Sequence, residues 1–318
     1  MVSIITPSYN QAGFLEETIL SVLDQDYPHI EYIIIDGGST DGSVEIIRKY
    51  ASRLAYWASE RDRGQSDAIN KGFRRAKGDI LGWINADDTY TPGSVRRAVE
   101  SLQTDASAVA AYGGNNMIDA SGRVLGTYPN PRRFRLRDEL RGNFICQPTV
   151  LMKRLPLFDV GLLDTRLHHA MDLDLWLKLG LKGPILSVGE VQANFRIHQE
   201  SKSISQLDCF LPEILYVLER FFARADLPPE IRAVRCLAYS DYYAFEAPDP
   251  VFRPRFLMTQ PQIRRMRQSL CRSILWYPFR ARTLATIVQI CDSYLETNMS
   301  PWVLRLSCAL DRRLQIGN

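Results

Sequence analysis

The chain has 318 residues, of which 46% are hydrophobic and 24% are charged. This composition excludes collagen-like, disulfide-framework and disordered proteins and suits one large domain or two. The net charge of +3 conceals an asymmetry, because residues 251–291 hold eight arginines and no acidic residue, so the remainder is slightly acidic. A basic block of this kind favours an anionic surface or substrate as its partner.

The N-terminal sequence predicts neither a membrane span nor a leader. Residues 1–15 form the longest stretch without a charge, and Pro7, Asn10 and Gly13 interrupt it, so no segment approaches the roughly 18 apolar residues of a spanning helix. No basic leader with an apolar stretch precedes Val2. We therefore expect a cytoplasmic protein. The six cysteines include no Cys-x-x-Cys pair, which predicts reduced and mostly buried thiols.

Short apolar runs alternate with helical patterns over the first hundred residues, as is typical of a parallel sheet built from strand–helix–strand units. Three strands are predicted at 2–6, 32–36 and 80–84. Helices are predicted around 15–23 and 44–50 from the spacing of their apolar residues. Ser66 is expected to cap a third helix, and Thr91-Pro92 is expected to begin a fourth.

The pattern changes twice along the rest of the chain. From about 113 to 165 it is irregular, as expected of a long excursion over the mouth of a sheet. Strand signals cease beyond about residue 206, where the pattern becomes helical. We therefore predict an α/β domain at 1–205 and a basic, amphipathic α-helical region at 206–318.

Polar residues stand directly after each predicted strand. The segments are TPSYN at 6–10, DGGS at 36–39 and NADD at 85–88. Ligands of open parallel sheets bind outside the carboxyl ends of the strands. Asp and Gly can also simply terminate a strand, but three such places in register favour a binding site.

The adjacent carboxylates Asp87 and Asp88 indicate a cation site. Two like charges side by side are unfavourable unless a cation or hydrogen-bond donors offset them. Oxygen ligands completed by substrate phosphates suit Mg²⁺ or Mn²⁺. The Gly-rich loop at 37–42 is not the dinucleotide fingerprint, because it lacks G-x-G-x-x-G and follows the second strand. A nicotinamide enzyme is therefore not expected.

Four segments occur in a distinctive order and spacing: IITPSYN at 4–10, IDGGSTDG at 35–42, DRGQSDAINKG at 62–72 and NADD at 85–88. As a set they resemble the family 2 glycosyltransferases, which have the GT-A fold, a Rossmann-like, mostly parallel sheet flanked by helices. The resemblance covers about residues 1–205. It implies a nucleotide-sugar donor, a divalent cation and inversion at the anomeric carbon.

The resemblance also implies roles for individual residues. The residues expected at the nucleotide are Thr6, Tyr9, Asp36, Asp67 and Asn70. Asp87 is expected to bind the metal, and Asp88 to help place the sugar. Asn85 stands where the family has Asp; it can hydrogen-bond a ribose but brings no charge, so metal affinity should depend mainly on Asp87.

A second acidic motif, MDLDLWL at 171–177, is expected to begin a helix. It is similar to the family's Glu-Asp motif, in which the Asp is the catalytic base, although Met171 replaces the Glu. Inverting transfer needs one base to take the proton of the acceptor hydroxyl, and the resemblance gives this role to Asp172. A first-turn acid favoured by the helix dipole is the alternative for Asp172 and our expectation for Asp174, paired with Lys178 four residues on.

Several other residues are candidates for the site. The segment from Arg196 to His198 resembles the one that closes the family's catalytic domain, so His198 is a candidate ligand of the metal or diphosphate, with a structural histidine as the alternative. His168 and His169 are candidates for contacting the acceptor. Gln147 and the proline after it suit either the acceptor side or a buried turn.

Residues 262–276 predict a basic amphipathic helix, with Ile263, Met266 and Leu270 on one side and arginines on the other. Such a helix can lie in the interface of an anionic membrane, or it can pack its apolar side on the rest of the protein. Nucleic acid is not an expected partner, because no recognised binding motif accompanies the charge.

These observations predict a metal-dependent, inverting glycosyltransferase that adds one sugar from a UDP-sugar. Its acceptor is expected to be a cell-envelope glycan or a lipid-linked molecule. The protein is expected at the inner face of the membrane or free in the cytoplasm. The Gln-x-x-Arg-Trp motif of processive members is absent. A nucleotidyltransferase would need a Gly-rich loop with a basic residue after the first strand. A non-catalytic nucleotide-sugar-binding or membrane-scaffold protein with the same fold remains the alternative, because of Asn85 and Met171.

Overall fold

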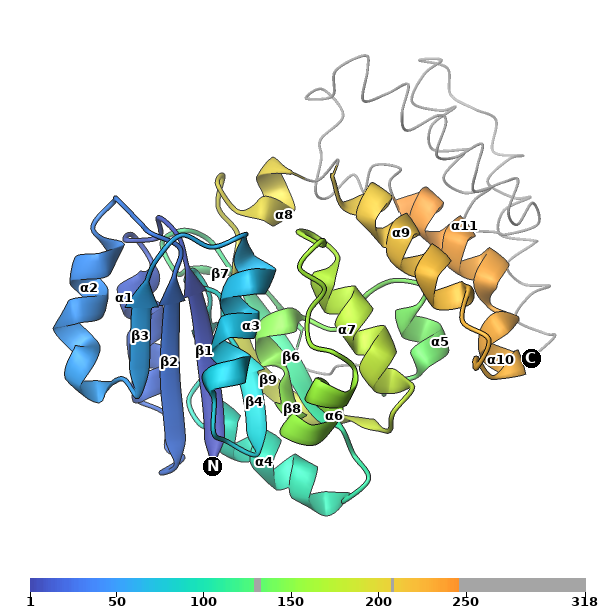
Figure 1. Cartoon of the computed structure of the whole chain (residues 1–318), viewed down its shortest axis with the longest axis horizontal. Coiled ribbons are helices and arrows are strands. Elements are labelled where there is room, and N and C mark those ends of the chain that lie inside the picture. The colour runs from blue at the N-terminus through green and yellow to red at the C-terminus, as the bar shows by residue number, and fades with distance from the viewer. Residues whose placement is uncertain (129–132, 207–208, 246–318) are drawn as a thin grey trace, which may run out of the picture. The chain divides into compact units, whose positions relative to one another are not determined.

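The computed structural model describes residues 1–128, 133–206 and 209–245 (Figure 1). The chain divides into two compact units, one made of Met1–Glu139 with Asn143–Glu213 and the other of Leu140–Gly142 with the chain from Ile214 onward. The expected boundary near residue 205 stays a prediction, and the basic helix expected at 262–276 lies outside the described residues. Within the described ranges, no helix combines the length and apolarity needed to cross a bilayer.

The first unit is built on a nine-stranded sheet in the order β3-β2-β1-β4-β8-β6-β9-β5, with β7 paired to β6. Its first half is parallel and contains β1 (Val2–Ser8), β2 (Ile30–Asp36), β3 (Tyr56–Ser59) and β4 (Ile80–Trp83). The three predicted strands are confirmed as β1, β2 and β4. The four-residue β3 escaped prediction because its sequence is too short to show an alternating pattern.

The second half of the sheet is mixed. It contains β5 (Thr89–Tyr90), β6 (Ala110–Ile118), β7 (Val124–Tyr128), β8 (Leu151–Lys153) and β9 (Ile185–Arg196). β6 runs parallel to β9, whereas β7 and β8 pair with β6 in the antiparallel sense. The irregular region expected at 113–165 therefore contains strands. The two glycines Gly113 and Gly114 hide the strand pattern of β6 in the sequence. The register with β9 shifts at this point, and a Cβ at Gly113 would collide with Gln192.

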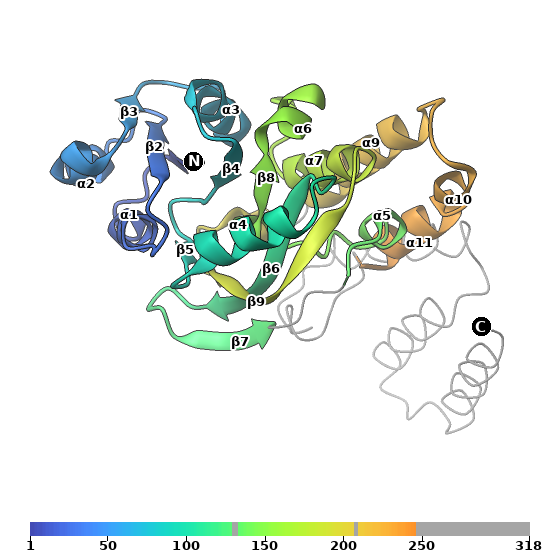
Figure 2. The ribbon, with the colours of Figure 1, turned by 90° about the horizontal axis from the view of Figure 1, so that it is seen from below.

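Helices cover both faces of the sheet. The first four are α1 (Leu15–Leu23), α2 (Ser43–Tyr50), α3 (Gln65–Arg75) and α4 (Ser94–Thr104), with a 3₁₀ turn η1 at Ala51–Arg53. Figure 2 shows α3 on one side of the sheet together with α6 (Arg154–Asp159) and α7 (Met171–Gly180), and α1 and α4 on the other side.

Two of the predicted helix starts were wrong by one to three residues. α3 begins at Gln65 after Gly64, so Ser66 lies inside the helix and donates its hydroxyl to Leu167 O instead of capping. α4 begins at Ser94, because Gly93 at φ 77° separates it from the turn at Thr91. Helix boundaries depend on such local dihedrals, which the apolar periodicity does not encode.

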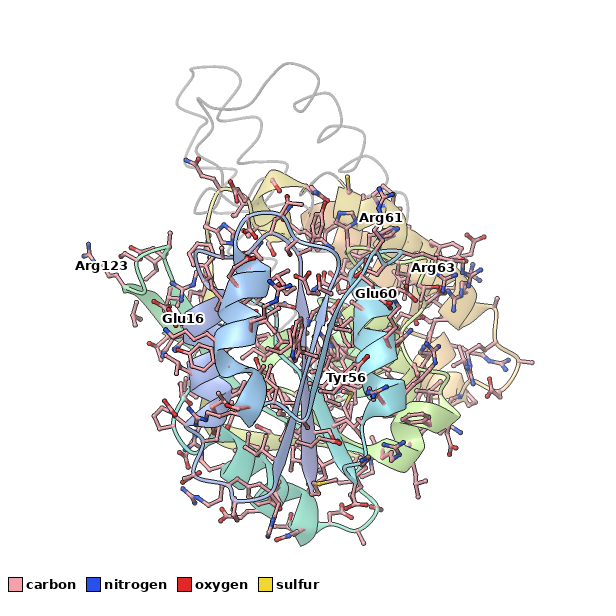
Figure 3. The ribbon with its side chains drawn as sticks, turned by 60° about the vertical axis from the view of Figure 1, so that its left-hand side comes forward. Glu16, Tyr56, Glu60, Arg61, Arg63 and Arg123 are labelled. Atoms are coloured by element: carbon pink, nitrogen blue, oxygen red, sulfur yellow. The ribbon has the colours of Figure 1, made fainter. Side chains whose placement is uncertain are left out.

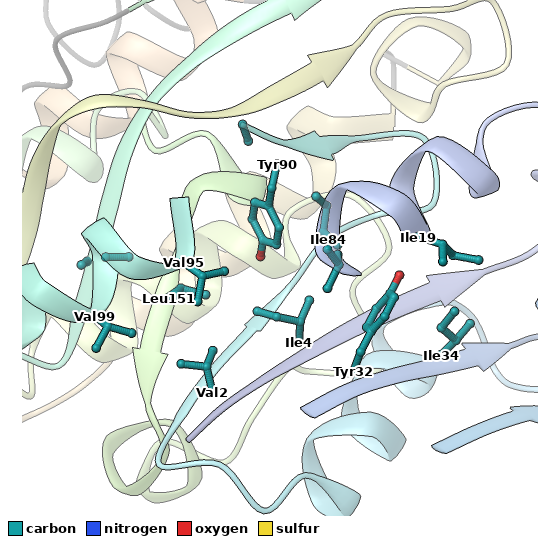
Figure 4. Close-up of a cluster of buried hydrophobic side chains, with 14 of the residues drawn as sticks. Val2, Ile4, Ile19, Tyr32, Ile34, Ile84, Tyr90, Val95, Val99 and Leu151 are labelled. Atoms are coloured by element: carbon teal, nitrogen blue, oxygen red, sulfur yellow. The ribbon is translucent and has the colours of Figure 1, made fainter. Parts of the chain in front are cut away.

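The main core lies between the sheet and helices α1 and α4 (Figure 4). Ile4 and Ile34 project from the strands toward Ile19 of α1 and Val95 of α4, and all four are buried. Alternate residues of β1 face the other side, where Ile5 packs against α3. A Cβ at Gly72 of α3 would lie 2.5 Å from Ile5 Cγ2, so this helix approaches the sheet through a glycine.

Aromatic stacking attaches α7 to the sheet. The rings of Trp83 at the end of β4 and Trp176 in α7 stack with centroids 5.6 Å apart, and Phe73 meets Trp83 edge-on at 6.0 Å. Such ring pairs contribute about 0.5–1.5 kcal/mol beyond the area they bury. The helix that begins with Met171 and Asp172 is thereby fixed to the strand that leads into Asn85.

The remaining described elements are short or helical. They are α5 (Leu136–Glu139), η2 (Gln147–Thr149), α8 (Lys202–Ser205), α9 (Phe210–Phe222), α10 (Pro229–Arg232) and α11 (Arg235–Phe245). The helical character expected after residue 206 is thus confirmed for 210–245. In the second unit, Arg141 pairs with the buried Asp241 at 2.7 Å.

The cysteine prediction was half right. Cys146, Cys209 and Cys236 are free thiols, as expected. They are not mostly buried, however: Cys209 and Cys236 are exposed, and Cys146 is half-buried. The other three cysteines lie outside the described residues.

Candidate active site

Asp36 ends β2 and anchors the loop that follows it. Its buried carboxylate accepts hydrogen bonds from Gly38 N at 3.0 Å, Ser39 N at 2.9 Å and Ser59 Oγ at 2.7 Å. Ser39 Oγ donates to the second carboxylate oxygen at 2.5 Å. This carboxylate therefore holds the start of the loop at 37–42 in place through its hydrogen bonds.

Tyr9 lies beside the same loop with 63% of its surface exposed. A Cβ at Gly37 would lie 3.3 Å from Tyr9 Cδ2 and 2.9 Å from Asp62 Oδ2, so the tyrosine ring and Asp62 converge on a bare backbone. Arg61 packs against Gly38 next to them. Figure 3 shows Arg61 and Arg63 at the carboxyl ends of the strands, well above Tyr56. An exposed ring and a flat glycine surface can receive a nucleobase.

Besides Asp36, three of the residues expected at the nucleotide are buried. Thr6 shares a 2.9 Å hydrogen bond with Tyr32 Oη inside the core. Asp67 in α3 accepts bonds from Arg63 N and the Arg63 guanidinium, both at 3.2 Å. Asn70, one turn further, donates to Leu163 O at 2.8 Å and accepts from Leu163 N at 3.1 Å. These side chains hold the walls of the site together.

A cavity of about 610 Å³ opens beside the Asp36 loop. Its lining residues are Ser39, Thr40, Val44, Glu45, Arg48, Trp57, Ala58 and Ser59. The cavity lies between α2 and the edge strand β3 and includes neither Asp87 nor Asp172. It is therefore not the place where the predicted chemistry would occur.

The two predicted metal ligands come together at the end of the sheet. His198 Nε2 lies 3.1 Å from Asp87 Oδ2, although 111 positions separate them in the chain. The imidazole packs on Phe14 with ring centroids 4.7 Å apart, which leaves 6% of the histidine side chain exposed and 20% of the aspartate side chain. The pair is therefore mostly buried, with the Asp87 carboxylate more exposed than the imidazole.

Asp88 turns inward from this point. Its carboxylate accepts a hydrogen bond from Arg196 N at 2.9 Å and from Asn85 Nδ2 at 3.3 Å. Burial, and then the negative charge of Asp87, raise the pKa of Asp88 well above its usual value, despite these bonds. Asp88 thus connects the loop after β4 to the end of β9.

Arg196 supports the acidic loop from within the protein. The residue is 2% exposed, and its guanidinium donates to Asp87 O at 2.8 Å, Asp119 O at 3.3 Å and Ala120 O at 3.2 Å. It also forms an ion pair with Glu17 of α1. One buried side chain therefore fixes the backbone that carries the predicted metal ligand.

Asn85 is the centre of a chain of polar side chains. Its Nδ2 donates to Gln147 Oε1 at 3.1 Å, and its Oδ1 accepts from Gln65 Nε2 at 2.7 Å. Lys202 Nζ in turn donates to Gln65 Oε1 at 2.8 Å. Burial lowers the pKa of Lys202, while the charges of Glu213 and Asp87 oppose that shift. A neutral amide at position 85 can serve both neighbours, as a carboxylate could not.

Asp172, the predicted base, lies half-buried in the first turn of α7. Its Oδ1 accepts from Leu173 N at 2.7 Å and its Oδ2 from Asn143 Nδ2 at 3.4 Å. Burial raises the pKa of Asp172, and the two hydrogen bonds oppose that shift. A carboxylate whose pKa moves toward neutral is better matched to accepting a proton at physiological pH.

The neighbours of Asp172 in α7 have structural contacts. Asp174 pairs with Lys178 at 3.0 Å, as the spacing of four residues predicted. Met171, which replaces the family's glutamate, lies with its sulfur 2.9 Å from Ser66 Oγ. A thioether here joins α7 to α3 and brings no charge.

Glu213 closes the N-terminus of α7. Its carboxylate accepts bonds from His168 N at 2.9 Å, His169 N at 2.7 Å and Ala170 N at 3.0 Å, and lies 3.1 Å from His169 Nδ1. Burial opposes ionisation, but the hydrogen bonds from His169, Ala170 and His168 lower the pKa of Glu213. The two histidines considered for acceptor contact are thus held by an acid on α9.

Cys146 interacts electrostatically with both Asp88 and Asp172. Burial, then the charges of Asp88 and Asp172, raise the pKa of its thiol well above the usual value. The thiol is therefore neutral and within electrostatic range of both carboxylates. Asp88 and Asp172 therefore share this thiol as an electrostatic neighbour.

The residues present fit a divalent cation only as a partial ligand set. No group of three or more His, Cys, Asp or Glu side chains able to hold a metal occurs among the residues that the structure describes. Asp87 and His198 supply one carboxylate oxygen and one imidazole nitrogen at a common point. Mg²⁺ and Mn²⁺ are often held by one or two protein ligands and completed by substrate phosphates and water, and this pair suits that arrangement.

Several residues of the site have contacts that the sequence did not predict, although Gln65 and Arg196 stand inside segments that carry the family resemblance. They are Gln65, Glu139, Asn143, Arg196, Lys202 and Glu213. Each acts through a partner far away in the chain or on a buried backbone group, so neither its type nor its spacing indicated a role. Arg196 lay two residues from the predicted His198, and its burial alone would have identified it.

The fold and the acidic site together define a glycosyltransferase of the GT-A class. The family model described as glycosyl transferase family 2 matches residues 3–157. The Bacillus subtilis protein TuaG, described as a putative teichuronic acid biosynthesis glycosyltransferase, is 30% identical over 208 residues, which are 64% of this chain and 81% of that relative. The chain belongs to glycosyl transferase family 2. In three further relatives, all named glycosyltransferases, the aligned region covers 36% to 67% of their length.

Solved structures confirm the fold. The S. aureus protein TarS, residues 1–349 in complex with UDP-GlcNAc, superposes with a TM-score of 0.66 at 17% identity, covering 90% of this chain and 83% of that one. The Pyrobaculum calidifontis mannosyltransferase PcManGT, in complex with GDP-Man and Mn²⁺, gives a TM-score of 0.59 at 18% identity, covering 93% and 88%. The GT-A expectation is confirmed, with more antiparallel pairing than predicted.

Proposed function

We propose that this protein transfers one sugar from a nucleotide-sugar donor, with UDP as the nucleotide, to a hydroxyl of a cell-envelope glycan or lipid-linked acceptor, with inversion and with a divalent cation. The observation that carries the proposal is the meeting of Asp87, in the loop that follows β4, with His198, which is 111 positions away in the chain. The names of TuaG and of the UDP-GlcNAc complex of TarS support the acceptor and donor classes.

In this mechanism the loop at 37–42 and Tyr9 bind the nucleotide. Asp172 accepts the proton of the attacking hydroxyl, while Leu173 N and Asn143 Nδ2 hold its carboxylate in place. A cation held by Asp87 and His198 would offset the charge that develops on the departing diphosphate. Arg196 and Asp88 keep the loop that bears Asp87 fixed.

The test measures UDP release from UDP-GlcNAc with Mn²⁺, using water as the acceptor. Asp172→Asn should lower kcat by about 10²–10⁴-fold, the usual contribution of a general base. Asp87→Ala should abolish the dependence on Mn²⁺. Asp174→Asn, in the same helix turn but paired with Lys178, is the matched control and should retain turnover in the folded fraction.

Two outcomes would refute parts of the proposal. Full activity of Asp172→Asn would show that Asp172 of α7 is not the catalytic base. Binding of UDP-GlcNAc by the wild-type chain without turnover, with any of several acceptors, would favour a non-catalytic nucleotide-sugar-binding protein, as the replacements at Asn85 and Met171 allow. The anomeric configuration of a transferred sugar, read by NMR, tests inversion separately.

A further inference from the structure

Glu139, the last residue of α5, is a buried carboxyl group that the proposed mechanism does not use. The residue has 0% of its surface exposed. Its Oε2 accepts a hydrogen bond from Phe144 N at 3.3 Å. Its Oε1 is buried and has no hydrogen-bond partner within the described part of the chain. A carboxylate with a free buried oxygen is costly, and a neutral carboxylic acid is much less so.

Asn143, four residues later, also has a buried oxygen without a hydrogen-bond donor in the part of the chain that the structure describes. Its Nδ2 donates to the base, Asp172 Oδ2, at 3.4 Å, and its backbone N–H donates to Glu139 O at 3.1 Å. Its Oδ1 is buried and, among the residues described, also lacks a donor. The residue adopts φ 35°, an unusual value for a side chain larger than glycine. The backbone is thus bent to present this amide to Asp172.

One proton would satisfy both orphaned oxygens. The Glu139 carboxyl lies at the amide of Phe144, next to Asn143, and both unpartnered atoms are acceptors. Protonating Glu139 converts one acceptor into a donor. We propose that Glu139 is a positioning residue for the transfer reaction: as a neutral acid it donates to Asn143 Oδ1 and so keeps Asn143 Nδ2 directed at Asp172. The inference rests on the proposed role of Asp172 as the base.

The electrostatic environment favours the neutral acid. Burial, and then the charge of Asp172, raise the pKa of Glu139 from 4.5 to about 8, and the nearby backbone N–H groups of Phe144 and Ile145 oppose this shift. Glu139 is therefore protonated at pH 7.

The other titratable groups around this pair are neutral or paired. Tyr112 of β6 interacts with Glu139, and burial keeps its phenol protonated. The thiol of Cys146 is neutral for the same reason. The further charges on α7, Asp174 and Lys178, pair with each other. On α5 itself, Arg137 pairs with Asp138.

Ionisation of Glu139 should release the base. Above about pH 8 the carboxylate loses its donor and becomes an acceptor, so the Asn143 amide can turn its Nδ2 toward Glu139 and leave Asp172. The kcat of the wild-type enzyme should then decline on the alkaline side and level off at the roughly 10–100-fold loss expected when Asn143 no longer holds Asp172.

Glu139→Gln is the decisive variant, because a glutamine mimics the neutral acid with one acceptor and one permanent donor. With UDP-GlcNAc and Mn²⁺ as the probe, this variant should keep wild-type kcat at pH 7 and lose the alkaline decline. Glu100→Gln, an exposed carboxylate on α4, is the control and should keep the wild-type profile. A Glu139→Gln profile that matches the wild type at every pH would overturn the proposal.

Asn143→Gly removes the amide and keeps the backbone, since glycine adopts positive φ freely. It should lower kcat by roughly 10–100-fold, with a melting temperature close to that of the wild type. Unchanged kcat in this variant would also refute the proposed series of hydrogen bonds from Glu139 through Asn143 to Asp172. Loss of the base itself is read separately, from Asp172→Asn, so the two failures are distinguishable.

A second readout needs no substrate. The folded state keeps the Glu139 proton between pH 4.5 and about 8, whereas the unfolded chain releases it. Wild-type stability should therefore fall as pH rises through this window, relative to Glu139→Gln, which has no such proton. Parallel denaturation curves of the two proteins from pH 5 to 8 would show that Glu139 is ionised in the native state, against the proposal.

Discussion

Arg196 shows how a single buried side chain determines the position of a catalytic loop. Its guanidinium contacts three backbone carbonyls and Glu17, and its own N–H binds Asp88. The planar guanidinium has five N–H donors, whereas a lysine ammonium has three on a flexible stem. The geometry around Asp87 therefore depends on an arginine that does not itself carry chemistry.

Arg196→Lys should destabilise the protein by about 2–5 kcal/mol, because several charge-assisted hydrogen bonds to buried carbonyls are lost. It should also lower the affinity for Mn²⁺ in the presence of UDP, since Asp87 loses its support. Urea denaturation and calorimetric titration measure the two effects. Arg96→Lys, on the exposed face of α4, should stay within about 0.5 kcal/mol of the wild type. Equal stability of the two variants would contradict this account of Arg196.

For single residues, the sequence indicated which residues belong to candidate sites better than it indicated which residues they contact. The motifs predicted Asp87 and His198 as metal ligands, and their side chains meet, while the metal role itself stays a prediction. The pairing of Asp174 with Lys178 followed from helical spacing. Asn143 could not be identified, because its role depends on a φ of 35° and on a contact across 29 positions. Roles that arise from tertiary contacts have no local pattern to predict them.

Helix α7 is fixed at two points, by the Trp83–Trp176 stack along its length and by Glu213 at its start. The first helical N–H groups have no intrahelical partner and carry a partial positive charge. Glu213 accepts hydrogen bonds from the N–H groups of the three residues that precede α7 and so places a negative charge beside the start of the helix. The first turn, which contains Asp172, is thereby held at a defined position.

Glu213→Gln should destabilise the protein by about 1–2 kcal/mol at pH 7, because the helix N-terminus loses its compensating charge. The pKa of Glu213 is lowered in the folded state, so its stabilising effect exists above the unfolded pKa and disappears as pH falls through the folded pKa. Melting curves of both proteins from pH 7 to 3 should converge at the acidic end. A constant difference over this range would show that the carboxylate charge is not the cause.

Elements with a long apolar pattern were predicted, whereas short ones were not. The seven-residue β1 and β2 are continuous buried runs and were found. β3 and β8, with four and three residues, were missed, because so short a stretch shows no period. Glycines also concealed β6, whose close approach to Gln192 requires them. Tertiary packing decides such segments.

For the whole molecule, the sheet brings the ends of β1, β2, β4 and β9 to one edge, so that distant motifs form a single site. Order and spacing of motifs predicted this edge, and the helical region after residue 206 was predicted from the loss of strand signals. The role of that region, including contact with an anionic membrane, stays a prediction. Its sequence carries charge and periodicity but no chemical motif.

Donor binding should stabilise the entire first unit, because the nucleotide and the metal ligands come from separate strands. At a ligand concentration about 100 times the dissociation constant, the gain is about 2.7 kcal/mol, or an increase in Tm of roughly 5–10 °C. UDP with Mn²⁺ should raise Tm more than either alone, and Asp87→Ala should remove the part that depends on Mn²⁺. If Mn²⁺ adds the same increment without UDP, the cation binds elsewhere.

The contact between Glu213 and the start of α7 also determines when the protein becomes competent during synthesis. Residue 170 leaves the ribosome 43 positions before the carboxylate that completes its helix. The strands, the acidic loop and Asp172 can assemble while the chain is still being made, but the segment that leads into α7 receives its acceptor only when the beginning of α9 emerges. A nascent chain paused before residue 213 would carry every proposed catalytic group and yet lack a fixed base.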